Sequence, residues 1–384
     1  MTSVYHILPH SSINRDARWN NVTDGWHARL GRAIQERSDY SIECWTVDHE
    51  LSEQYCTSEG GVVYRVFPSL FPPGTNAIQR AISPFVGTFA EEVLEVTPDL
   101  FRAIRRRLAE ERNPIFHLHS DTYLNTYLVT FLFSGARLYL QHHGGLRGLP
   151  RLERRLFRAF NHAFALTVEK KQYFSRTVGL PEQRVSIRTM GVDTNKYRPG
   201  DNPGVRKEIG SDYLVYVGKY DSYKGLDKIL ASFKQIRETH DVQLVLLGGR
   251  KSDNLYNEAN RMSGVHPITD FVSDARMISY YREASVFTSF PKKAALKAGD
   301  CGIISPAEAV ACGTPIVTPV LRFFPSEDRN QIGRLPETTE ELRQGIVEWL
   351  HMDFDPEVLH KIAERVFSWS RVAETVIERY QSEE

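Results

Sequence analysis

The strongest constraint on the fold is an alternation, kept along almost the whole chain, between short β-branched apolar runs and amphipathic helical segments. Parallel strands need long crossover connections, which helices usually supply, so this pattern predicts parallel sheets covered by helices. The expected strands are residues 4–8, 42–47, 62–66, 115–118, 137–141 and 163–168 in the first half, and 214–217, 242–247, 286–289 and 315–319 in the second. The clearest helical patterns are residues 225–239, 274–283 and 340–351.

The length of 384 residues is large for one domain and suits two. The two series of elements meet in residues 191–204, a segment rich in Pro, Gly, Asp and Asn that we interpret as a linker. We therefore expect an α/β protein with two Rossmann-like, doubly wound domains. Such domains bind ligands at the carboxyl ends of their strands, here in a deep interdomain cleft. Residues 68–88, rich in Phe, Pro and Gly, predict a long loop.

Composition argues against several other classes of protein. Lys and Arg number 48, and Asp and Glu also number 48, so no net charge attracts the chain to nucleic acid. No stretch reaches the roughly 18 apolar residues of a membrane span, and residues 127–133 predict only a short buried helix. The first nine residues lack signal-peptide features, and the four cysteines lack metal-ligand spacing. We expect free thiols and a cytoplasmic location.

The first strand of the second half leads into a possible anion site. Residues 214–217 are followed by Gly218 and Lys219, and Lys224 and Gly225 open a helix a few residues later. The N–H groups and dipole of a helix N-terminus, with two ammonium groups beside them, would suit a diphosphate. The alternative is that both lysines are ordinary solvated surface residues.

A second segment, residues 300–315, carries a carboxylate near a helix start. Ser305 fits an N-cap and Pro306 the first helical position, so Glu308 can reach back to the Ser305 N–H in a capping box. Taken alone, this structural role is favoured. A carboxylate at the carboxyl edge of a sheet is, however, also where nucleotide-binding folds hold ribose hydroxyls.

Histidines end two strands of the first half: His117 and His119 in one, His142 and His143 in the other. Two pairs suggest a metal, but adjacent strand residues point to opposite faces, so His142 and His143 cannot easily share one ion. We expect no metal site. A histidine at the carboxyl end of a strand is the better functional candidate, although such a residue is often simply hydrogen-bonded.

The chain has no G-x-S-x-G elbow, no Walker A motif and no G-x-G-x-x-G after the first strand. Hydrolase, kinase-like and dinucleotide-binding functions therefore lack their usual sequence support.

Considered together, the segments resemble the family 4 retaining glycosyltransferases of GT-B fold, with the motifs in the family's order. The sequence EAVACGTPIV, which begins at Glu308, matches the family's EAmAcGtPvv segment and is the most specific likeness. Residues 217–219 with 224–227 resemble its vGR…KGvd segment, and residues 179–199, 244–249 and 271–287 match further motifs. The likeness covers most of residues 164–319 and is loose before them.

The resemblance implies a hexosyltransferase that moves a sugar, with retention and without a metal, from a nucleotide sugar to a hydroxyl of a glycan or lipid-linked acceptor. It implies no cofactor, the co-substrate being a UDP- or GDP-sugar. The donor would bind to a domain of residues 196–366. The acceptor would bind to residues 1–195, completed by a C-terminal helix of about residues 367–384.

The same resemblance assigns roles to particular residues. Lys219 and Lys224 would bind the donor diphosphate, Glu308 the ribose, and Asp300 would be the sugar-side acid. The catalytic group would comprise His143, Asp300 and Lys224, with His119 and His142 on the acceptor side. The remaining donor-binding residues would be Gly25, Gly218, Val272, Gly302, Ile303 and Ile304.

Four positions depart from the family pattern. Lys219 stands where the family has an Arg, and a lysine cannot form the bidentate hydrogen bonds of an arginine. Asp300 stands where the family has a Glu, and its side chain is shorter. Residues 291–299 form a longer connection than usual, which we expect to be a loop. Its lysines, Lys292, Lys293 and Lys297, would contact a negatively charged donor or acceptor, or else be solvated. Gly25 is the one glycine in residues 20–25, where the family has a glycine-rich loop.

Two segments rich in arginine raise the question of a membrane surface. In residues 148–160, Leu149, Leu152, Leu156 and Phe160 would share one helical face among Arg151, Arg154, Arg155 and Arg158. A second cluster in residues 98–112 contains Arg102, Arg105, Arg106 and Arg107. A basic amphipathic helix can lie on the anionic inner face of a membrane. The favoured alternative is that both are core-packing helices with solvated arginines.

Two rival functions remain open. The departures at Lys219 and Asp300 would fit a non-catalytic glycosyltransferase-like protein that binds a sugar or a partner. A GT-B sugar-nucleotide epimerase is the other rival, distinguished by turnover without an acceptor.

Overall fold

The chain forms two compact units. The computed structural model describes residues 2–11, 26–48, 51–59, 61–69, 96–121, 123–143, 150–200, 204–298 and 302–382. Unit 1 comprises Met1–Thr189 with Val372–Glu384, and unit 2 comprises Met190–Arg371. The sequence-based boundaries lie at residue 195 and near residue 367.

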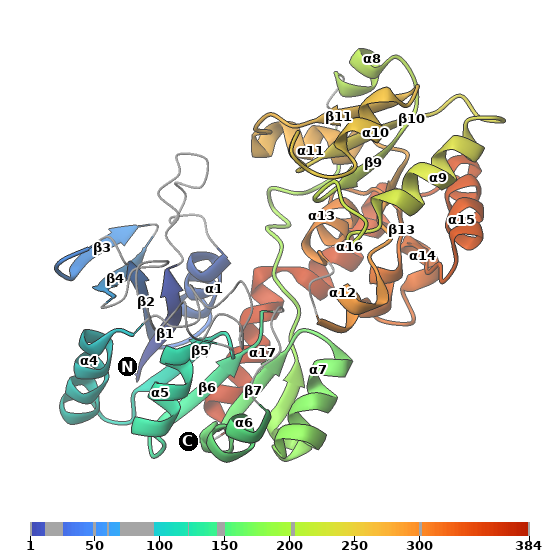
Figure 1. The fold of residues 1–384 in the computed structure, drawn as a ribbon. Helices are drawn as coiled ribbons and strands as arrows, with labels where there is room; N and C mark the ends of the chain where they lie inside the picture. Colours follow the sequence, from blue (N-terminus) through green and yellow to red (C-terminus); the bar gives the residue numbers. More distant parts are fainter. Residues whose placement is uncertain are drawn as a thin grey trace. The chain divides into compact units, whose positions relative to one another are not determined.

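Unit 1 is built on an eight-stranded sheet with the order β3-β4-β2-β1-β5-β6-β7-β8. Neighbouring strands are parallel except for the antiparallel β3–β4 pair. The strands are β1 Thr2–Ser11, β2 Tyr40–Asp48, β3 Tyr55–Glu59, β4 Val62–Pro68, β5 Ile115–His119, β6 Arg137–Gln141, β7 His162–Ala165 and β8 Val185–Ile187. The helices are α1 Trp26–Gln35, α4 Pro98–Glu110, α5 Leu124–Leu132, α6 Pro150–Leu156, α7 Val168–Gln172 and α17 Trp369–Gln381 (Figure 1).

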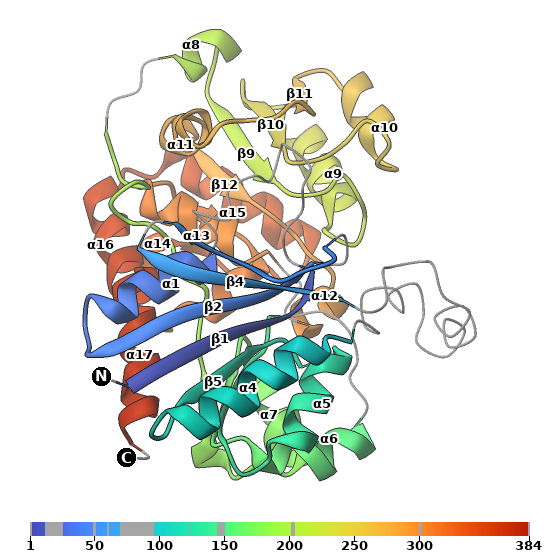
Figure 2. The same ribbon diagram turned by 90° about the vertical axis from the view of Figure 1, so that its left-hand side faces the viewer.

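The two faces of the unit 1 sheet differ in chemistry. One face buries an apolar cluster against α4 and α5, which includes Ile7, Phe116 and Leu140 from the strands and Leu100 from α4. The other face carries buried polar rings and is covered by α1 and α17, since His27 of α1 contacts Tyr64 and Tyr380 of α17 contacts His117 (Figure 2).

Helix α5 lies where the sequence predicted a short buried helix in residues 127–133, but it is buried on one side only. Tyr127 and Val129 belong to the apolar cluster, whereas Phe131 is 64% exposed and Leu132 is 50% exposed. A single amphipathic face, rather than complete burial, is enough to hold a helix on a sheet.

Unit 2 contains a six-stranded sheet with the order β11-β10-β9-β12-β13-β14, in which every neighbouring pair is parallel. The strands are β9 Tyr213–Val217, β10 Gln243–Leu247, β11 Val265–Ile268, β12 Val286–Thr288, β13 Ile316–Val317 and β14 Gly333–Arg334. In order along the chain they are arranged 3-2-1-4-5-6, which is doubly wound, and the order reverses between β9 and β12. Ligands bind beyond the carboxyl ends of the strands at such a point.

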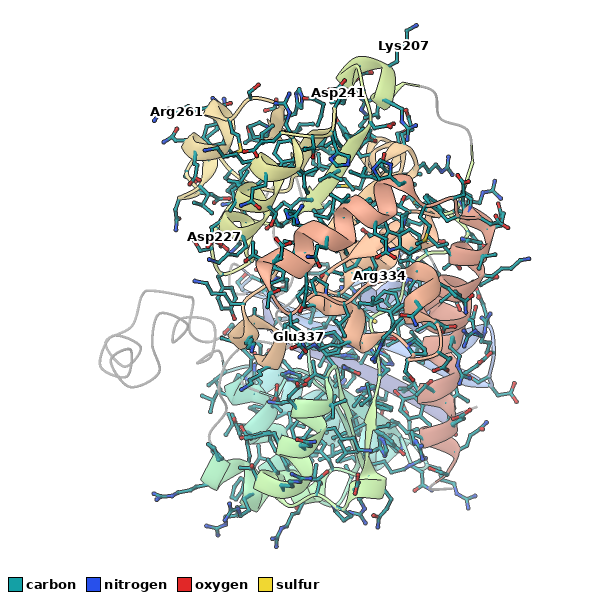
Figure 3. All side chains as sticks on the ribbon, turned by 90° about the vertical axis from the view of Figure 1, so that its right-hand side faces the viewer. Lys207, Asp227, Asp241, Arg261, Arg334 and Glu337 are labelled. Carbon is teal, nitrogen blue, oxygen red and sulfur yellow. The ribbon has the colours of Figure 1, made fainter. Side chains whose placement is uncertain are left out.

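Helices cover both faces of this second sheet. They are α8 Val205–Ile209, α9 Leu226–Ile236, α10 Tyr256–Arg261, α11 Asp274–Glu283, α12 Lys293–Ala298, α13 Ile304–Ala311, α14 Arg329–Ile332, α15 Thr339–His351 and α16 Pro356–Phe367. Aliphatic residues of α9 and α15 pack with Leu214, Leu244 and Val286 in one core. Charged side chains such as Lys207, Asp241 and Arg261 lie on the outside (Figure 3).

Several sequence expectations need correction at this level. Residues 291–299 are not a loop throughout, because Lys293–Ala298 forms the helix α12. The predicted strand 163–168 ends at Ala165, and Val168 begins α7. Strands β3, β8, β11 and β14 were not predicted; each has five residues or fewer. The expected loop 68–88 lies almost entirely outside the described residues.

No helix in the described part of the chain is long and apolar enough to cross a membrane. Cys44, Cys56 and Cys312 are free thiols, as expected.

Candidate functional site

The carboxyl edge of the unit 2 sheet brings two loops into contact at the point where the strand order reverses. The segment after β9 touches the segment after β12, because the Lys292 N–H donates to the Tyr223 carbonyl at 3.1 Å. Gly225 packs against the same segment: a Cβ on residue 225 would lie 1.7 Å from the Phe290 carbonyl oxygen. Gly225 also has a φ of +79°, which favours glycine. The close approach therefore requires glycine at this position.

Local hydrogen bonds fix the course of the loop between β9 and α9. The Tyr216 hydroxyl donates to the Lys219 carbonyl at 2.7 Å, and the Lys224 N–H donates to the Asp221 carboxylate at 2.8 Å. Gly218 donates its N–H to the carbonyl of Leu247 on the neighbouring strand at 2.8 Å. These contacts place Lys224 directly before Gly225 and the first turn of α9, where the helix dipole favours an anion.

Five lysines follow the two central strands. Lys219 is exposed, and Lys224 is half-buried with its Nζ 5.8 Å from the centre of the Tyr223 ring. Lys292, Lys293 and Lys297 are exposed on and beside α12. The structure thus places the lysine-rich segment on the same sheet edge as the two predicted diphosphate lysines.

Glu308 lies on α13, but it does not form a capping box. The helix begins at Ile304 with Ile303 at the N-cap position and no side-chain cap, so Ser305 lies inside the helix. The Glu308 carboxylate instead accepts a hydrogen bond from the Tyr281 hydroxyl of α11 at 3.0 Å. Burial and the negative charge of Glu308 raise the pKa of Tyr281 well above its usual value. Tyr281 therefore stays a neutral donor that orients the carboxylate.

The remaining donor-side candidates lie on neighbouring loops. Gly302 has a φ of +69°, and no described atom lies within 4 Å of the point that a Cβ would occupy there. Ile303 and Ile304 open α13. Val272 is half-buried in the loop between β11 and α11, next to Phe271, which is 74% exposed. The predicted residues Asp300 and Gly25 lie outside the described residues.

In unit 1, the candidate His143 belongs to a chain of side chains rather than standing alone. Its Nε2 lies 3.0 Å from Nδ1 of His119, and Nε2 of His119 lies 3.0 Å from Nδ1 of His6. The Tyr380 hydroxyl lies 2.6 Å from Nδ1 of His117 and 3.5 Å from Nε2 of His6. Imidazoles joined in this way constrain one another's tautomers, because each bond needs one donor and one acceptor.

His142 has different partners from His143, in keeping with the opposite directions expected for neighbours. Its Nδ1 lies 2.8 Å from Asp121, whose second oxygen lies 2.5 Å from the Lys170 ammonium. Burial opposes ionisation of Asp121, but the charges of His142 and Lys170 outweigh it and hold its pKa well below the usual range. His142 is thus held in a buried cluster with Asp121 and Lys170, and His143 in a network of aromatic rings.

Burial keeps three rings of that network, His6, His117 and His119, uncharged at neutral pH. It lowers the pKa of His6 to about 3, with a further contribution from the charge of Arg188. The pKa values of His117 and His119 are also well below the usual range, first because of burial and then because of neighbouring rings and Arg188.

Sequence reasoning missed four members of this region: His6, Trp26, Arg188 and Tyr380. The Trp26 ring centre lies 4.2 Å from that of His143 and 4.8 Å from that of His119. The alternation of side chains along a strand could have revealed part of this network, because it places His117 and His119 on the same face of β5. In the sheet, His6 of β1 is paired with His117 of β5. Tyr380 gave no such signal, being more than 200 residues away along the chain.

The same rings offer a possible metal site, which the sequence did not predict. One nitrogen each from His6, His117 and His119 lies within 4.8 Å of the others, and all three residues are buried. Neutral imidazoles are good ligands for zinc and related ions. The nearby positive charge of Arg188 opposes a second cation, however.

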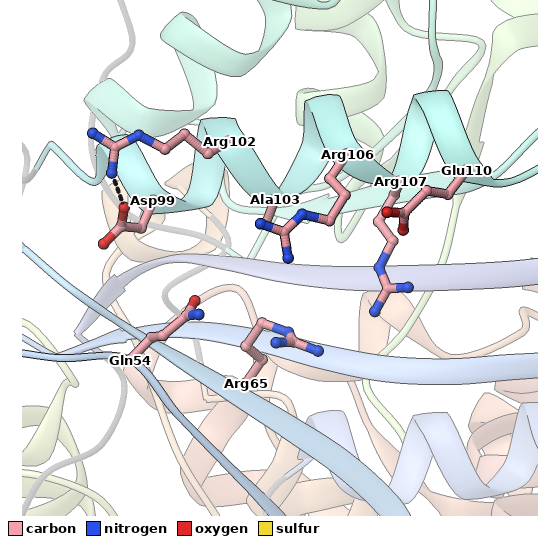
Figure 4. Close-up of a pocket in the computed structure, with 8 residues that line it drawn as sticks. All are labelled: Gln54, Arg65, Asp99, Arg102, Ala103, Arg106, Arg107 and Glu110. Atoms are coloured by element: carbon pink, nitrogen blue, oxygen red, sulfur yellow. Dashed lines mark hydrogen bonds and ion pairs between the residues drawn. The ribbon is translucent and has the colours of Figure 1, made fainter.

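A groove on the surface of unit 1 lies between α4 and strand β4, and Gln54, directly before β3, also lines it. Figure 4 shows its lining, with Arg65, Arg106 and Arg107 directed into the space between helix and strand. Acidic neighbours offset much of this charge, because Arg65 and Arg107 pair with Glu43 and Arg102 pairs with Asp99. In the sequence, the residues that line this groove are far from the loops that follow β9 and β12 of unit 2.

The predicted basic amphipathic helix in residues 148–160 is shorter than expected. Helix α6 ends at Leu156 and a 3₁₀ turn follows. Leu152 is 37% exposed, whereas Glu153 is fully buried and Phe157 and Phe160 reach the apolar core. The Tyr127 hydroxyl donates to Glu153 at 2.9 Å, which explains how a carboxyl group takes an inward position. The predicted Leu149 lies outside the described residues.

Comparisons with known proteins find relatives of unit 2. Residues 203–366 match the family model described as "Glycosyl transferases group 1", a match that covers less than half of the chain. A D-inositol 3-phosphate glycosyltransferase of Segniliparus rotundus is 26% identical over 162 residues, which cover 39% of this chain. The match spans 35% of that relative's length.

Solved structures resemble the chain over its whole length. An alpha,alpha-trehalose-phosphate synthase (UDP-forming) from Burkholderia vietnamiensis has a TM-score of 0.65 at 14% identity, covering 100% of both chains. An Anabaena protein in complex with UDP and glucose has a TM-score of 0.60 at 12% identity, also covering 100% of both chains. These likenesses show the fold: the protein has the GT-B fold, which confirms the sequence prediction.

Proposed function

We propose that this protein is a retaining, metal-independent glycosyltransferase of the family 4 type, which moves a hexose from a nucleotide sugar to an acceptor hydroxyl. The observation that carries the proposal is the contact of the two loops at the strand-order reversal of unit 2. There, the Lys292–Tyr223 hydrogen bond and the Gly225–Phe290 packing gather lysines at the mouth of α9. A diphosphate has the charge that such an edge would stabilise.

The proposed chemistry is a same-face displacement. The bond between the sugar C1 and the diphosphate oxygen breaks, and a new bond forms between C1 and the acceptor oxygen on the face that the leaving group vacates. The acceptor's proton passes to an oxygen of the departing diphosphate. Lys219 and Lys224 would neutralise the charge that grows on this leaving group, the role that a metal ion has in other transferases. We propose that no cofactor is needed.

The other donor residues fit around this position. Glu308, oriented by Tyr281, would accept hydrogen bonds from the ribose hydroxyls. Val272 would border the base, and Gly218 and the segment Gly302–Ile304 would approach the phosphates and sugar through their backbone. Asp300 and Gly25 keep their proposed roles on the resemblance alone. The Anabaena neighbour, which binds UDP and glucose, favours a UDP-sugar over a GDP-sugar as the first donor to test.

On the acceptor side, we propose that His143 borders the sugar and the acceptor hydroxyl. Its ring is half-buried and held by His119, so its orientation is fixed before substrate binds. His142 would contribute through its cluster with Asp121. The relative named D-inositol 3-phosphate glycosyltransferase suggests a phosphorylated polyol as one acceptor to test beside glycans and lipid-linked sugars.

Lys224→Ala is the sharpest test of the donor site. We expect kcat to fall by about 10²–10³, because one charge on the developing diphosphate is lost. The assay measures nucleoside diphosphate release from UDP- and GDP-hexoses with acceptor, and excess EDTA should leave the wild-type rate unchanged. Proton NMR of the product should show a retained anomeric configuration.

Lys228→Ala is the matched control, since Lys228 is exposed on the first turn of the same helix, with its Nζ 3.9 Å from the Asp227 carboxylate. Equal rates for Lys224→Ala and wild type would remove the diphosphate role of Lys224. Nucleotide binding without any transfer would favour the non-catalytic rival, and turnover without acceptor would favour the epimerase.

We also propose a cytoplasmic protein that attaches peripherally to anionic membranes. Exposed Leu152 lies among Arg151, Arg154 and Arg155, and the groove of Figure 4 adds a second set of arginines. Such a surface suits a lipid-linked acceptor. Failure of the protein to sediment with anionic liposomes at low salt would rule this out.

A further inference from the structure

We propose that unit 1 contains an oxyanion-binding site built on Arg188, which takes a phosphate or carboxylate group beneath the helix α17. The site uses none of the lysines of unit 2. Only one part of the inference, that the group can belong to an acceptor molecule, rests on the proposed function.

The first observation is a buried guanidinium that none of the described residues pairs. Arg188 follows β8, where its N–H continues the ladder by donating to the Ala165 carbonyl at 2.9 Å. Its side chain is only 2% exposed, and Nε, Nη1 and Nη2 are all buried without a hydrogen-bond partner in the described part of the chain. A guanidinium carries five donors, and native proteins very rarely bury such a group unpaired.

The charge of Arg188 persists despite this burial. Desolvation lowers the pKa of the guanidinium to about 10, which still leaves it protonated at neutral pH. Burying an isolated charge is strongly unfavourable, so a partner of opposite charge is favoured. The charge lies over the ring of Phe164, 5.9 Å from its centre, and that contact alone offers no hydrogen-bond acceptor.

A second group with an unused nitrogen borders the same ring. His117 stacks on Phe164 with 5.4 Å between ring centres, and its Nε2 is buried with no hydrogen-bond partner among the described residues. Its Nδ1 is occupied by the Tyr380 hydroxyl. A neutral imidazole with Nε2 protonated would donate to the same oxyanion as the guanidinium.

The charges around this point favour an anion over a metal cation. His6, His117 and His119 are neutral, so Arg188 gives the cluster a net charge of one positive unit. The charge of Arg188, which adds to the effect of burial in lowering the pKa of the three rings, also opposes a dication placed among them. The planar fork of a guanidinium also matches the geometry of phosphate and carboxylate oxygens.

The test compares unfolding with and without inorganic phosphate. In phosphate-free buffer, Arg188→Met should unfold at the same temperature as wild type or higher, because it removes an unpaired buried charge. Phosphate at a hundredfold excess over its Kd should raise the wild-type Tm by roughly 5 °C, with sodium chloride matching the ionic strength. Arg188→Met should show no phosphate response, and Arg188→Lys, which keeps the charge but loses the fork, a weaker one.

Arg184→Met is the control, since Arg184 is exposed four residues earlier and should respond as wild type does. A wild-type Tm that phosphate does not change, or an equal rise in Arg188→Met, overturns the site. A rise caused by zinc instead of phosphate overturns it in favour of the three histidines as metal ligands.

Kinetics distinguish the two sources of the anion. If the acceptor carries it, Arg188→Met should raise KM for a phosphorylated acceptor about tenfold or more and leave KM for the dephosphorylated acceptor unchanged. If free phosphate occupies the site, KM stays the same for both acceptors while the difference in Tm persists. The measurement of Tm requires no catalytic turnover. It would therefore show whether Arg188 binds an anion even if the protein transferred no sugar.

Discussion

The two sheets bury their polar groups in different ways. In unit 2 the central strands are mainly aliphatic, and the candidate donor residues lie beyond their carboxyl ends, Lys224 in the loop before α9 and Glu308 on helix α13. In unit 1 one face is equally apolar, but the other buries His6, His117 and His119 within the sheet itself. In unit 2 the candidate functional residues therefore lie outside the apolar core, whereas in unit 1 a part of the core is itself polar and titratable.

Because of this difference, substitutions and pH changes should disrupt the two units in different ways. A loop-based site depends on a few close backbone approaches, so one misplaced atom should disrupt it locally. A buried polar network depends on protonation and on complete hydrogen bonding, so it should respond to pH and to the loss of single hydroxyl groups.

The largest effect is expected from Gly225→Ala. The added Cβ would lie 1.7 Å from the Phe290 carbonyl oxygen in a backbone conformation that suits glycine, so the two loops must separate. We expect unit 2 to lose about 3 kcal/mol of stability or more. Hydrogen exchange, measured peptide by peptide, should show faster exchange in β9 and β12 and unchanged exchange in β1 and β5.

Gly135→Ala is the matched control. At residue 135 none of the described heavy atoms lies within 4 Å of a Cβ position and φ is not positive, so its substitution should change exchange nowhere. Unchanged protection of β9 in Gly225→Ala would mean that the loop contact does not support the sheet edge.

A smaller effect should appear on acidification, and in unit 1 first. The folded pKa of His6 is about 3 against 6.5 for the free side chain, so below pH 6.5 the unfolded chain binds a proton that the folded chain does not. Stability is therefore complete above pH 6.5 and falls as the pH drops toward 3. The loss for His6 alone is roughly 2 kcal/mol at pH 5. His117 and His119 act in the same direction.

Calorimetry at pH 7 and pH 5, with limited proteolysis to identify the unit that opens, measures this difference. His6→Gln should give a shallower dependence on pH whatever its stability at pH 7. Equal losses in both units would contradict the contrast between the two sheets.

The sequence could predict unit 2 far better than the polar face of unit 1, for physical reasons. The residues of the donor edge lie in short contiguous segments, and their motifs follow strands and begin helices, so spacing carries the information. Chain order also predicted the doubly wound fold. The position of Glu308 was predictable but its partner was not, since Tyr281 lies 27 residues away on another helix.

The network in unit 1 depends instead on strand pairing. Its members come from β1, β5, the end of β6 and the C-terminal helix, and only the register of the sheet places His6 beside His117. Arg188 and Tyr380 have ordinary sequence surroundings, so their burial could not be predicted from local pattern. Short strands such as β8 and β14 were missed because two or three residues give no periodic signal.

The smallest predicted effect concerns the hydroxyl that closes this network. Tyr380→Phe removes the group that lies 2.6 Å from His117 and leaves a buried ring nitrogen unpaired. We expect a loss of about 1–2 kcal/mol in urea unfolding. Tyr55→Phe, at a residue that is 41% exposed, should cost close to nothing and is the control.

A double-mutant cycle then tests whether the rings act as one unit. If the proton of one ring sets the tautomer of the next, removing the Tyr380 hydroxyl should change the cost of His119→Gln, although the two residues share no direct hydrogen bond in the chain His143–His119–His6–Tyr380. We expect a coupling of about 0.5 kcal/mol or more. Strict additivity would mean that each ring finds its own partner, and that the polar face of unit 1 is a set of separate pairs rather than a network reaching His143.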